Sequence, residues 1–356
     1  MKYLLITNVP SPYRVKQYNL IGKELGADFF IIYTDSTFKT TQMQWTIPKL
    51  THNHMFLDSK NKYIIKKLVI IVKIIAKERP KIVITSGFNI IMLLGFSLSK
   101  IIKAKHIVFS DSWLHSINSL SIIHHLARRI VIKRSDAFIC VGKKGKEYLR
   151  HFDAIDGKIF LSRLSDDINL DKVVNHNKEY DIMFSGQFIE RKNPEFFVDV
   201  ALALKDKIPN LKVLLVGSGP LSERICSLMK DGGIEYKYPG FISPHKIKEY
   251  YIKTKVFLFP TKDDPWGMVV NDAMSVGVPV ITSPFSGAAD DLVIDGNNGF
   301  VIDLNVELWV EKVYQLLTNE KLYNKFSINA LDKVKEFSVE KAANNFVFAL
   351  SKTVEE

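Results

Sequence analysis

Short apolar runs alternate with longer segments of helical periodicity along almost the whole chain. The apolar runs are four to six residues long and end in polar loops, as buried strands of parallel sheets do. Strands are predicted at 3–7, 29–33, 82–85, 106–110, 137–141, 158–161, 181–186, 211–216, 236–240, 256–259 and 278–282. Helices are predicted at 15–25, 60–79, 90–98, 119–134, 142–148, 243–254, 308–317 and 339–354. The alternation predicts an α/β protein with two Rossmann-like, doubly wound domains that face each other across a cleft.

The predicted domain boundaries follow from a polar stretch of mixed charge near the middle of the chain. We expect an N-terminal domain at 1–165, a linker at 166–178 and a C-terminal domain at 179–335. The remaining segment, 336–356, is predicted to form a helix that packs back toward the N-terminal domain. A length of 356 residues is sufficient for two domains with separate cores.

Composition and cysteine use predict a cytoplasmic protein. Apolar residues make up 47% of the chain and charged residues 24%, and no signal peptide is visible. Cys140 and Cys226 stand in apolar contexts, so we expect buried, reduced thiols. Eighteen uncharged residues separate Lys81 from Lys100, but the turn at 85–89 interrupts them, so we expect a strand and a helix there rather than a membrane span.

Positive charge is concentrated in the N-terminal half. Residues 1–175 contain 28 basic and 13 acidic side chains, whereas residues 176–356 contain 21 and 25. This asymmetry predicts an anionic partner for the N-terminal half. Nucleic acid, anionic lipid headgroups and phosphorylated acceptors all fit the charge alone.

Two predicted helices of this half are both basic and amphipathic. In the helix at 60–79 the lysines fall on one face, and they are Lys62, Lys66, Lys73 and Lys77. The helix at 119–134 carries His124, His125, Arg128, Arg129, Lys133 and Arg134. One interpretation is that these helices lie on an anionic membrane surface. The other is that they are basic solvent faces packed on the sheet.

Polar side chains follow two strands of the N-terminal half. Arg14 comes just after the loop behind the first strand, where its guanidinium could reach a phosphate or a sugar. Asp111 and His115 follow the strand at 106–110 and are the acid and imidazole best placed for chemistry. The alternatives are a solvated arginine, a helix-capping aspartate and a surface histidine.

In the C-terminal half, the strand at 181–186 leads into a loop suited to an anion. The loop begins at Gly186 and contains Lys192, and Pro194 stands where the first residue of a helix would fall. Lysine supplies charge and the amides of the helix start supply donors. A second small-residue turn follows the next strand at Gly217.

The segment 256–302 contains a further βαβ pattern with two acidic positions. Asp264 precedes the predicted helix and Asp272 lies inside it, eight residues later. A small-residue loop at 286–289, a short helix and Gly296 follow the second strand. Carboxylates accept well from paired sugar hydroxyls. The alternatives are solvated acids, or a metal site at Asp263 and Asp264; we predict no metal, because cations and helix ends can face a diphosphate without one.

The motif from Asp264 to Asp272 resembles that of the retaining glycosyltransferases with the GT-B fold, glycosyltransferase family 4. It reads Asp-Pro-Trp-Gly-Met-Val-Val-Asn-Asp-Ala and continues to Gly277-Val-Pro-Val. The family has glutamates at both acidic positions, and each aspartate is shorter by one methylene, about 1.5 Å. The likeness covers roughly 180–335 and the architecture of the N-terminal half, where Pro10-Ser-Pro-Tyr-Arg14 replaces the family's usual glycine pair.

The resemblance implies roles for individual residues. Asp264 would hold hydroxyls of the donor sugar and Asp272 those of the ribose, while Lys192 would bind the diphosphate. Gln187 stands where the family has a second cation, so Arg191 or Arg14 would have to replace it. The implied donor-binding residues are Arg14, Gly186, Gln187, Arg191, Lys192, Gly217, Phe241, Asp264, Trp266, Gly267, Met268 and Asp272. The implied catalytic residues are Asp111, His115, Lys192 and Asp264, with Asp111 and His115 competing for the role of the family's N-domain histidine.

The predicted function is transfer of a hexose, with retention and without a metal, from a nucleotide diphosphate sugar to a lipid-linked or oligosaccharide acceptor. The N-terminal domain would serve the acceptor and the C-terminal domain the nucleotide sugar, in cell-surface polysaccharide or lipopolysaccharide assembly. We expect no cofactor, since the nucleotide sugar is a substrate, and no nucleic-acid partner. The protein would work in the cytoplasm, at the inner face of the membrane. The alternatives are a nucleotide-sugar epimerase of the same fold and a non-catalytic paralogue that binds nucleotide sugar or membrane.

Overall fold

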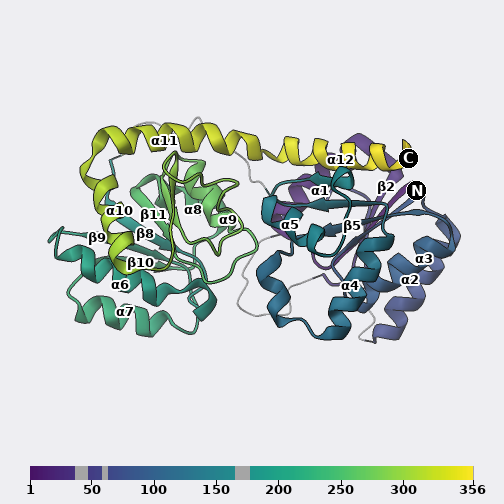
Figure 1. Cartoon of the computed structure of the whole chain (residues 1–356), viewed down its shortest axis with the longest axis horizontal. Coiled ribbons are helices and arrows are strands. Elements are labelled where there is room, and N and C mark those ends of the chain that lie inside the picture. Colours follow the sequence, from purple (N-terminus) through teal and green to yellow (C-terminus); the bar gives the residue numbers. More distant parts are fainter. Residues whose placement is uncertain (37–46, 58–62, 165–176, 356) are drawn as a thin grey trace. The chain divides into compact units, whose positions relative to one another are not determined.

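The computed structural model describes residues 1–36, 47–57, 63–164 and 177–355. The chain divides into two compact units (Figure 1). Unit 1 contains Met1–Ser165 and Val339–Glu356, and unit 2 contains Asp166–Ser338. Most of the predicted linker at 166–178 lies outside the described residues, as does Lys62.

Unit 1 is built on a parallel sheet with the strand order β3-β2-β1-β4-β5-β6-β7. The strands are β1 (Tyr3–Thr7), β2 (Phe29–Tyr33), β3 (His54–Phe56), β4 (Ile82–Ser86), β5 (Lys105–Ser110), β6 (Ala137–Cys140) and β7 (Ile159–Leu161). The helices are α1 (Pro12–Leu25), α2 (Ile64–Glu78), α3 (Ile90–Ile101), α4 (Ile122–Arg134), α5 (Lys143–His151) and α12 (Val339–Glu355). One core lies between the sheet and α1 with α12, and the opposite face is covered by α2, α3, α4 and α5.

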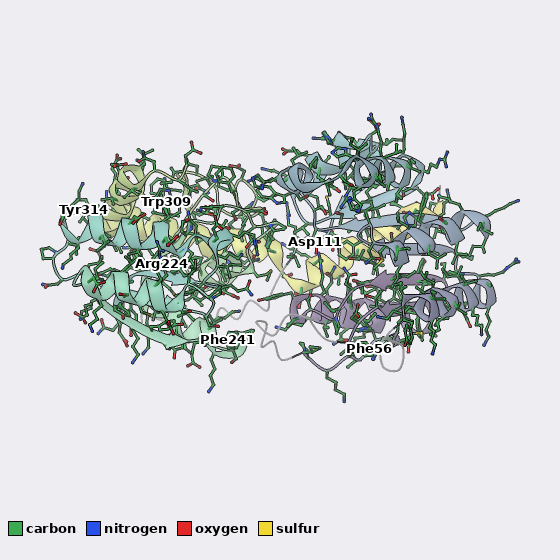
Figure 2. The ribbon with its side chains drawn as sticks, turned by 90° about the horizontal axis from the view of Figure 1, so that it is seen from below. Phe56, Asp111, Arg224, Phe241, Trp309 and Tyr314 are labelled. Carbon is green, nitrogen blue, oxygen red and sulfur yellow. The ribbon has the colours of Figure 1, made fainter. Side chains whose placement is uncertain are left out.

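Unit 2 has a second parallel sheet, in the order β10-β9-β8-β11-β12-β13. Its strands are β8 (Tyr180–Ser185), β9 (Lys212–Val216), β10 (Glu235–Gly240), β11 (Thr254–Phe259), β12 (Val280–Thr282) and β13 (Gly299–Val301). Its helices are α6 (Pro194–Lys205), α7 (Ser222–Asp231), α8 (Pro244–Ile252), α9 (Met268–Met274), α10 (Val306–Thr318) and α11 (Glu320–Val334). The fully buried Trp309 of α10 belongs to the core between helices and sheet (Figure 2).

The predicted fold class is confirmed, because both sheets are parallel and both reverse their strand order, as doubly wound domains do. Several elements were not predicted: β3 and β13 have only three residues each, and α7 and α11 have largely polar sequences. Cys140 is buried as expected, whereas Cys226 is only partly buried. Within the described ranges, no helix is long and apolar enough to span a membrane.

The short helix predicted after residue 289 is wrong. The structure has turns there instead, and the buried side chain of Asn298 binds their backbone. Its amide oxygen accepts from Ile294 N at 2.8 Å, and its amide nitrogen donates to Leu292 O at 3.0 Å. Such side-chain bonds satisfy backbone groups that a helix would otherwise pair, so they stabilise the turn.

In the sheet of unit 2, the strand order reverses between β8 and β11. Loops at the carboxyl ends of these two strands therefore lie side by side. They are the loop that begins at Gly186 and the loop that begins at Pro260. Both contain residues that the sequence predicts for the site.

Candidate active site

Backbone and side-chain hydrogen bonds join the two loops at the reversal point. The carbonyl of Arg191 accepts from Lys262 N at 2.9 Å and from Thr261 Oγ1 at 3.0 Å. In return, the guanidinium of Arg191 donates to the carbonyl of Asp263 at 2.5 Å. The two loops therefore hold each other in register, and the side chains next to these bonds are positioned by both.

The Lys192 ammonium forms an ion pair with Oδ2 of Asp264, within this pair of loops. Only 12% of the lysine side chain and 11% of the aspartate side chain are exposed. Arg191 lies farther away, with its guanidinium 3.9 Å from the same oxygen. Burial, followed by the neighbouring charge of Arg191, lowers the pKa of Lys192 to about 7. The site thus contains a lysine that titrates near neutrality beside a buried carboxylate.

The loop after β12 supports Asp264 through its backbone. Asp264 N donates to Phe285 O at 3.0 Å, and Gly287 N donates to Asp264 O at 2.8 Å. A Cβ on Gly287 would lie 1.8 Å from Pro265 O, so only glycine permits this approach. The predicted small-residue loop at 286–289 therefore acts on the candidate site by shaping the backbone around Asp264.

Trp266 anchors the start of α9. Its backbone amide donates to Oδ1 of Asp264 at 3.1 Å, and its indole donates to Asn271 Oδ1 at 2.8 Å. The ring is buried and packs on Phe337, with centroids 5.6 Å apart. Asp272 also lies in α9 and is 6% exposed. Thus both acids of the motif are buried, one in the loop and one in the helix that follows.

Glycines allow the loops after β8, β9 and β10 to approach one another. Gly217 has φ 128°, and a Cβ there would lie 1.8 Å from the carbonyl oxygen of Gly186. Gly217 N donates to Gly240 O at 2.9 Å, and Phe241 follows directly at the end of β10 (Figure 2). Gln187, the position where the family has a cation, lies in the first of these loops.

In unit 1 the structure pairs two of the predicted residues with each other. The guanidinium of Arg14 donates to Oδ1 of Asp111 at 2.6 Å and to Gln17 Oε1 at 2.9 Å. It also lies over the ring of Phe109, 4.4 Å from the centroid. The Arg14 side chain is 7% exposed and that of Asp111 is 49% exposed. Arg14 is therefore a buried partner of Asp111, and the solvated arginine considered as an alternative is excluded.

His115, the other predicted residue of this half, contacts an aromatic ring. It is exposed and stacks on Trp113, with ring centroids 5.3 Å apart. The Lys144 ammonium lies 5.3 Å from the centroid of the same Trp113 ring. Asp111, which follows β5 directly, is exposed as well (Figure 2), so both residues remain candidates for the predicted role.

Sequence reasoning missed the residues that hold Arg14 and Asp264 in place. Gln17 donates to Ser162 Oγ at 2.7 Å and to Ala342 O at 3.0 Å, which links α1 to the end of β7 and to α12. Ser283 Oγ donates to Thr261 O at 2.5 Å beneath the Asp264 loop. Their only signal in the sequence is that they are polar residues within otherwise apolar segments. The sequence does not show whether such a polar side chain is buried or exposed.

Within the described ranges, no group of three or more His, Cys, Asp or Glu side chains is placed to hold a metal ion.

Residues 166–333 match the family model described as glycosyl transferases group 1, which confirms the resemblance drawn from the motif. A GalNAc-alpha-(1->4)-GalNAc-alpha-(1->3)-diNAcBac-PP-undecaprenol alpha-1,4-N-acetyl-D-galactosaminyltransferase of Campylobacter jejuni is 26% identical over 61% of this chain and 60% of its own. The 2-deoxystreptamine N-acetyl-D-glucosaminyltransferase of Niallia circulans is 28% identical over 66% of this chain and 56% of its own. The chain thus matches about 60% of the length of these relatives.

Solved structures confirm the fold of the whole chain. The UDP complex of HepE from Anabaena superposes with a TM-score of 0.78 at 17% identity, over 99% of this chain and all of the other. The apo form of the lipopolysaccharide outer core galactosyltransferase WaaB gives a TM-score of 0.74 at 16% identity, over 99% of each chain. At such identities the likeness establishes the GT-B architecture.

Proposed function

We propose, from the premise that its C-terminal unit is of the glycosyl transferase group 1 type, that this chain transfers a sugar from a nucleotide diphosphate donor. The observation that carries the proposal is the buried Lys192–Asp264 pair at the carboxyl ends of β8 and β11. A cation for a diphosphate and an acceptor for sugar hydroxyls stand together at the edge where doubly wound sheets bind ligands.

The two charges can exchange partners when the donor binds. In the free protein, Lys192 and Asp264 satisfy each other. A donor diphosphate would attract the lysine and leave the carboxylate to accept from hydroxyls of the donor sugar. As the glycosidic bond breaks, negative charge grows on the leaving nucleoside diphosphate, and the lysine stabilises it. Arg191, anchored on the carbonyl of Asp263, adds a second positive charge at this edge.

The finer parts of the proposal extend this scheme. The reaction retains the anomeric configuration and uses no metal, because Lys192 and Arg191 supply the positive charge. Asp272 binds the ribose, and the loops at Gly217 and Phe241 receive the base. The acceptor is lipid-linked or a saccharide in glycoconjugate assembly at the cytoplasmic face of the membrane. Relatives named for undecaprenol-linked and lipopolysaccharide acceptors support this assignment.

The test is a panel of nucleotide sugars, assayed for binding by calorimetry and for turnover with lipid-linked and soluble saccharide acceptors. We expect acceptor-dependent release of a nucleoside diphosphate with one donor. Isomerisation of the donor without an acceptor, followed by NMR, would identify an epimerase instead. Tight donor binding without any turnover would identify a non-catalytic paralogue. Neither binding nor turnover with any donor would refute the proposal.

A further inference from the structure

The helices α2, α3 and α4 expose aliphatic side chains on the outer face of unit 1. Twelve of the nineteen large hydrophobic residues exposed in the described part of the chain lie within 63–130. Single exposed aliphatic residues are ordinary, but a concentration of this kind marks an interaction site. Six of these residues, which we call the aliphatic face, are Ile65, Val69, Val72, Ile122, Ile123 and Leu126.

The positions on each helix form a continuous side. In α2, Ile65, Val69 and Val72 are spaced by four and three residues, while the buried side of the helix contains Ile71 and Ile75. In α4, Ile122 and Leu126 are spaced by four residues, and Ile122 and Ile123 are 88% and 78% exposed. The buried residues of α4, Val131 and Ile132, point to the sheet. The exposed aliphatic side chains are therefore additional to those required by the core.

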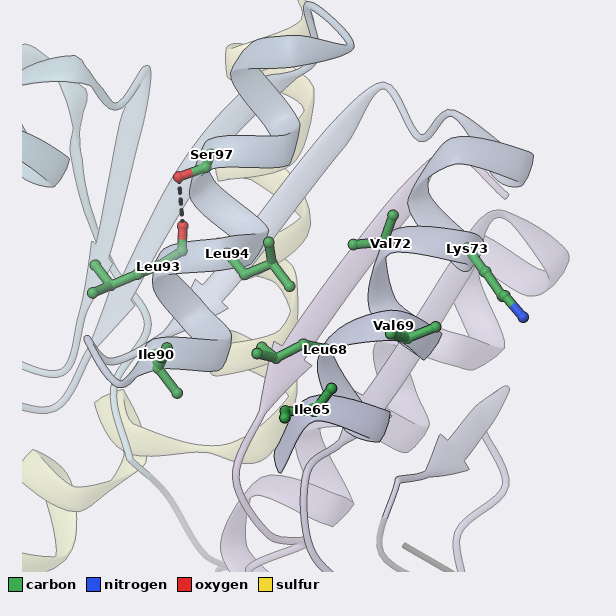
Figure 3. A pocket seen from close by; sticks show the side chains of 9 residues that line it. All are labelled: Ile65, Leu68, Val69, Val72, Lys73, Ile90, Leu93, Leu94 and Ser97. Carbon is green, nitrogen blue, oxygen red and sulfur yellow. Dashed lines mark hydrogen bonds between the residues drawn. The ribbon is translucent and has the colours of Figure 1, made fainter. Parts of the chain in front are cut away.

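A shallow groove lies within this surface, between α2 and α3. It has a volume of about 560 Å³, and its walls are almost entirely aliphatic (Figure 3). Ile65 and Val72 project from one side and Ile90 and Leu94 from the other. Lys73 is the only charged residue among those that line it. The surface thus contains an apolar groove as well as exposed aliphatic side chains.

Basic residues surround the aliphatic face. Residues 63–134 contain thirteen Lys and Arg and two Asp and Glu, so this segment has the same net charge, +11, as the whole chain. Lys66, Lys73 and Lys77 of α2 are exposed beside the aliphatic side of that helix. On α4, Arg129 and Lys133 share an ion pair with Asp153.

We propose that the aliphatic face docks on an anionic lipid bilayer, with its isoleucines in the headgroup region and its lysines on lipid phosphates. Aliphatic side chains beside lysines fit a surface that is apolar inside and negative outside. Nucleic acid would leave the isoleucines without a partner. A second copy of the chain would bring two strongly positive faces together. The bilayer is the occupant that satisfies both the aliphatic and the basic residues.

The inference deepens the proposed function by placing the enzyme next to a lipid-linked acceptor, and it can be tested separately. The protein is sedimented with vesicles of phosphatidylcholine alone and of phosphatidylcholine with an equal amount of phosphatidylglycerol. The vesicles contain neither donor nor acceptor. Failure of sugar transfer would therefore leave the vesicle result intact, and failure of vesicle binding would leave the donor site intact.

We expect binding to the vesicles with phosphatidylglycerol and little to those without it. The double variant I122S/I123S lowers the partition coefficient by roughly tenfold or more, because two aliphatic side chains no longer enter the bilayer. The variant K66Q/K73Q lowers the partition coefficient by roughly fivefold for each lysine removed. Added salt also lowers the partition coefficient, because it screens the attraction between the lysines and the lipid phosphates. The controls are I328S, an exposed isoleucine of unit 2, and K321Q/K325Q, exposed lysines of unit 2. They bind as the parent protein does.

Absence of sedimentation with the anionic vesicles would overturn the proposal. So would equal losses in the face variants and the controls. The protein could also form a dimer in the absence of vesicles. If I122S/I123S converted that dimer to a monomer, the aliphatic face would be a contact between two copies of the chain, and the proposal of bilayer docking would be refuted. Unchanged thermal unfolding of each variant shows that a loss of binding is not a loss of fold.

Discussion

Lys192 and Asp264 are 72 residues apart in sequence and form a buried ion pair at the strand reversal of unit 2. Each comes from a loop that the other loop holds in register through Arg191 and Thr261. Removing both charges from water is costly, so such a pair is weak evidence of a stabilising role. In the proposed donor site both groups would be released to the ligand.

Replacing Lys192 by Met should lower turnover with the identified donor by roughly 10²–10³-fold, because the charge on the leaving diphosphate loses its main cation. Donor affinity should fall as well, measured by calorimetry. Lys262→Met is the matched control, since this lysine stands in the partner loop and its side chain is 49% exposed. Unchanged turnover in Lys192→Met would exclude the role of this lysine in phosphate binding.

Replacing Asp264 by Asn should lower kcat/KM by about 10–100-fold, the amount expected for hydrogen bonds of a charged acceptor. Asp264→Glu should retain most activity, since it keeps the carboxylate and restores the family's residue. Glu190→Gln is the control, because this acid stands in the partner loop and its side chain is 87% exposed. Equal losses in the Asn and Glu variants would indicate a role in packing instead of hydroxyl binding.

Donor binding should weaken as the pH rises above about 7. The pKa of Lys192 is lowered to about 7 by burial, so above that pH the free protein must take up a proton before the lysine can bind a diphosphate. Affinity should therefore fall by up to about tenfold per pH unit, whereas below pH 7 it should level off. The measurement is calorimetry with the donor itself, whose diphosphate does not titrate in this range. Lys192→Met should remove the pH dependence.

Lys192 should also make the free energy of unfolding depend on pH. Its pKa in the folded protein lies below its ordinary value of 10.5, so the unfolded chain binds more protons between about pH 7 and 10.5. The contribution of Lys192 to the free energy of unfolding therefore rises with pH across that window. Urea unfolding of the parent and of Lys192→Met at several pH values measures the difference. A contribution that falls with pH would contradict the lowered pKa.

Gly287→Ala should lower the free energy of unfolding by about 1–3 kcal/mol, because a Cβ would lie 1.8 Å from Pro265 O. The substitution should also weaken donor binding, since the new Cβ would displace the backbone next to Asp264. Gly157→Ala is the matched control, as a Cβ there meets nothing within 4 Å. Normal donor affinity in Gly287→Ala would show that the loop at 286–289 supports the fold but not the site.

Arg14→Met should lower the free energy of unfolding by about 1–3 kcal/mol. Gln17 loses a buried partner, and the stacking on Phe109 is lost. Arg224→Met is the control: this side chain is 69% exposed in an ion pair with Glu195, so its removal should change stability by less than about 1 kcal/mol (Figure 2). Equal stability in the two variants would contradict the structural role of Arg14.

Local pattern was sufficient to predict most of the architecture. Buried parallel strands are continuous apolar runs, so β1, β2 and β11 stand out in the sequence. Three-residue β3 and β13 were missed, because so few residues give no pattern and their pairing depends on neighbouring strands. The turn held by Asn298 was also missed, since a side chain that competes for backbone bonds has no periodic signature.

The sequence by itself determined which residues carry charge and which segments end at a strand, and these were enough to select Lys192, Asp264 and Asp272. Only the tertiary structure decided which of them meet. Lys192 and Asp264 are brought together by the pairing of β8 with β11, a contact between distant segments. Arg14, predicted as a donor-site residue, is bound by Asp111 and Gln17, a pairing that the sequence alone did not indicate. The physical reason is that charge and periodicity are local properties of a chain, whereas ion pairs and burial depend on which strands become neighbours.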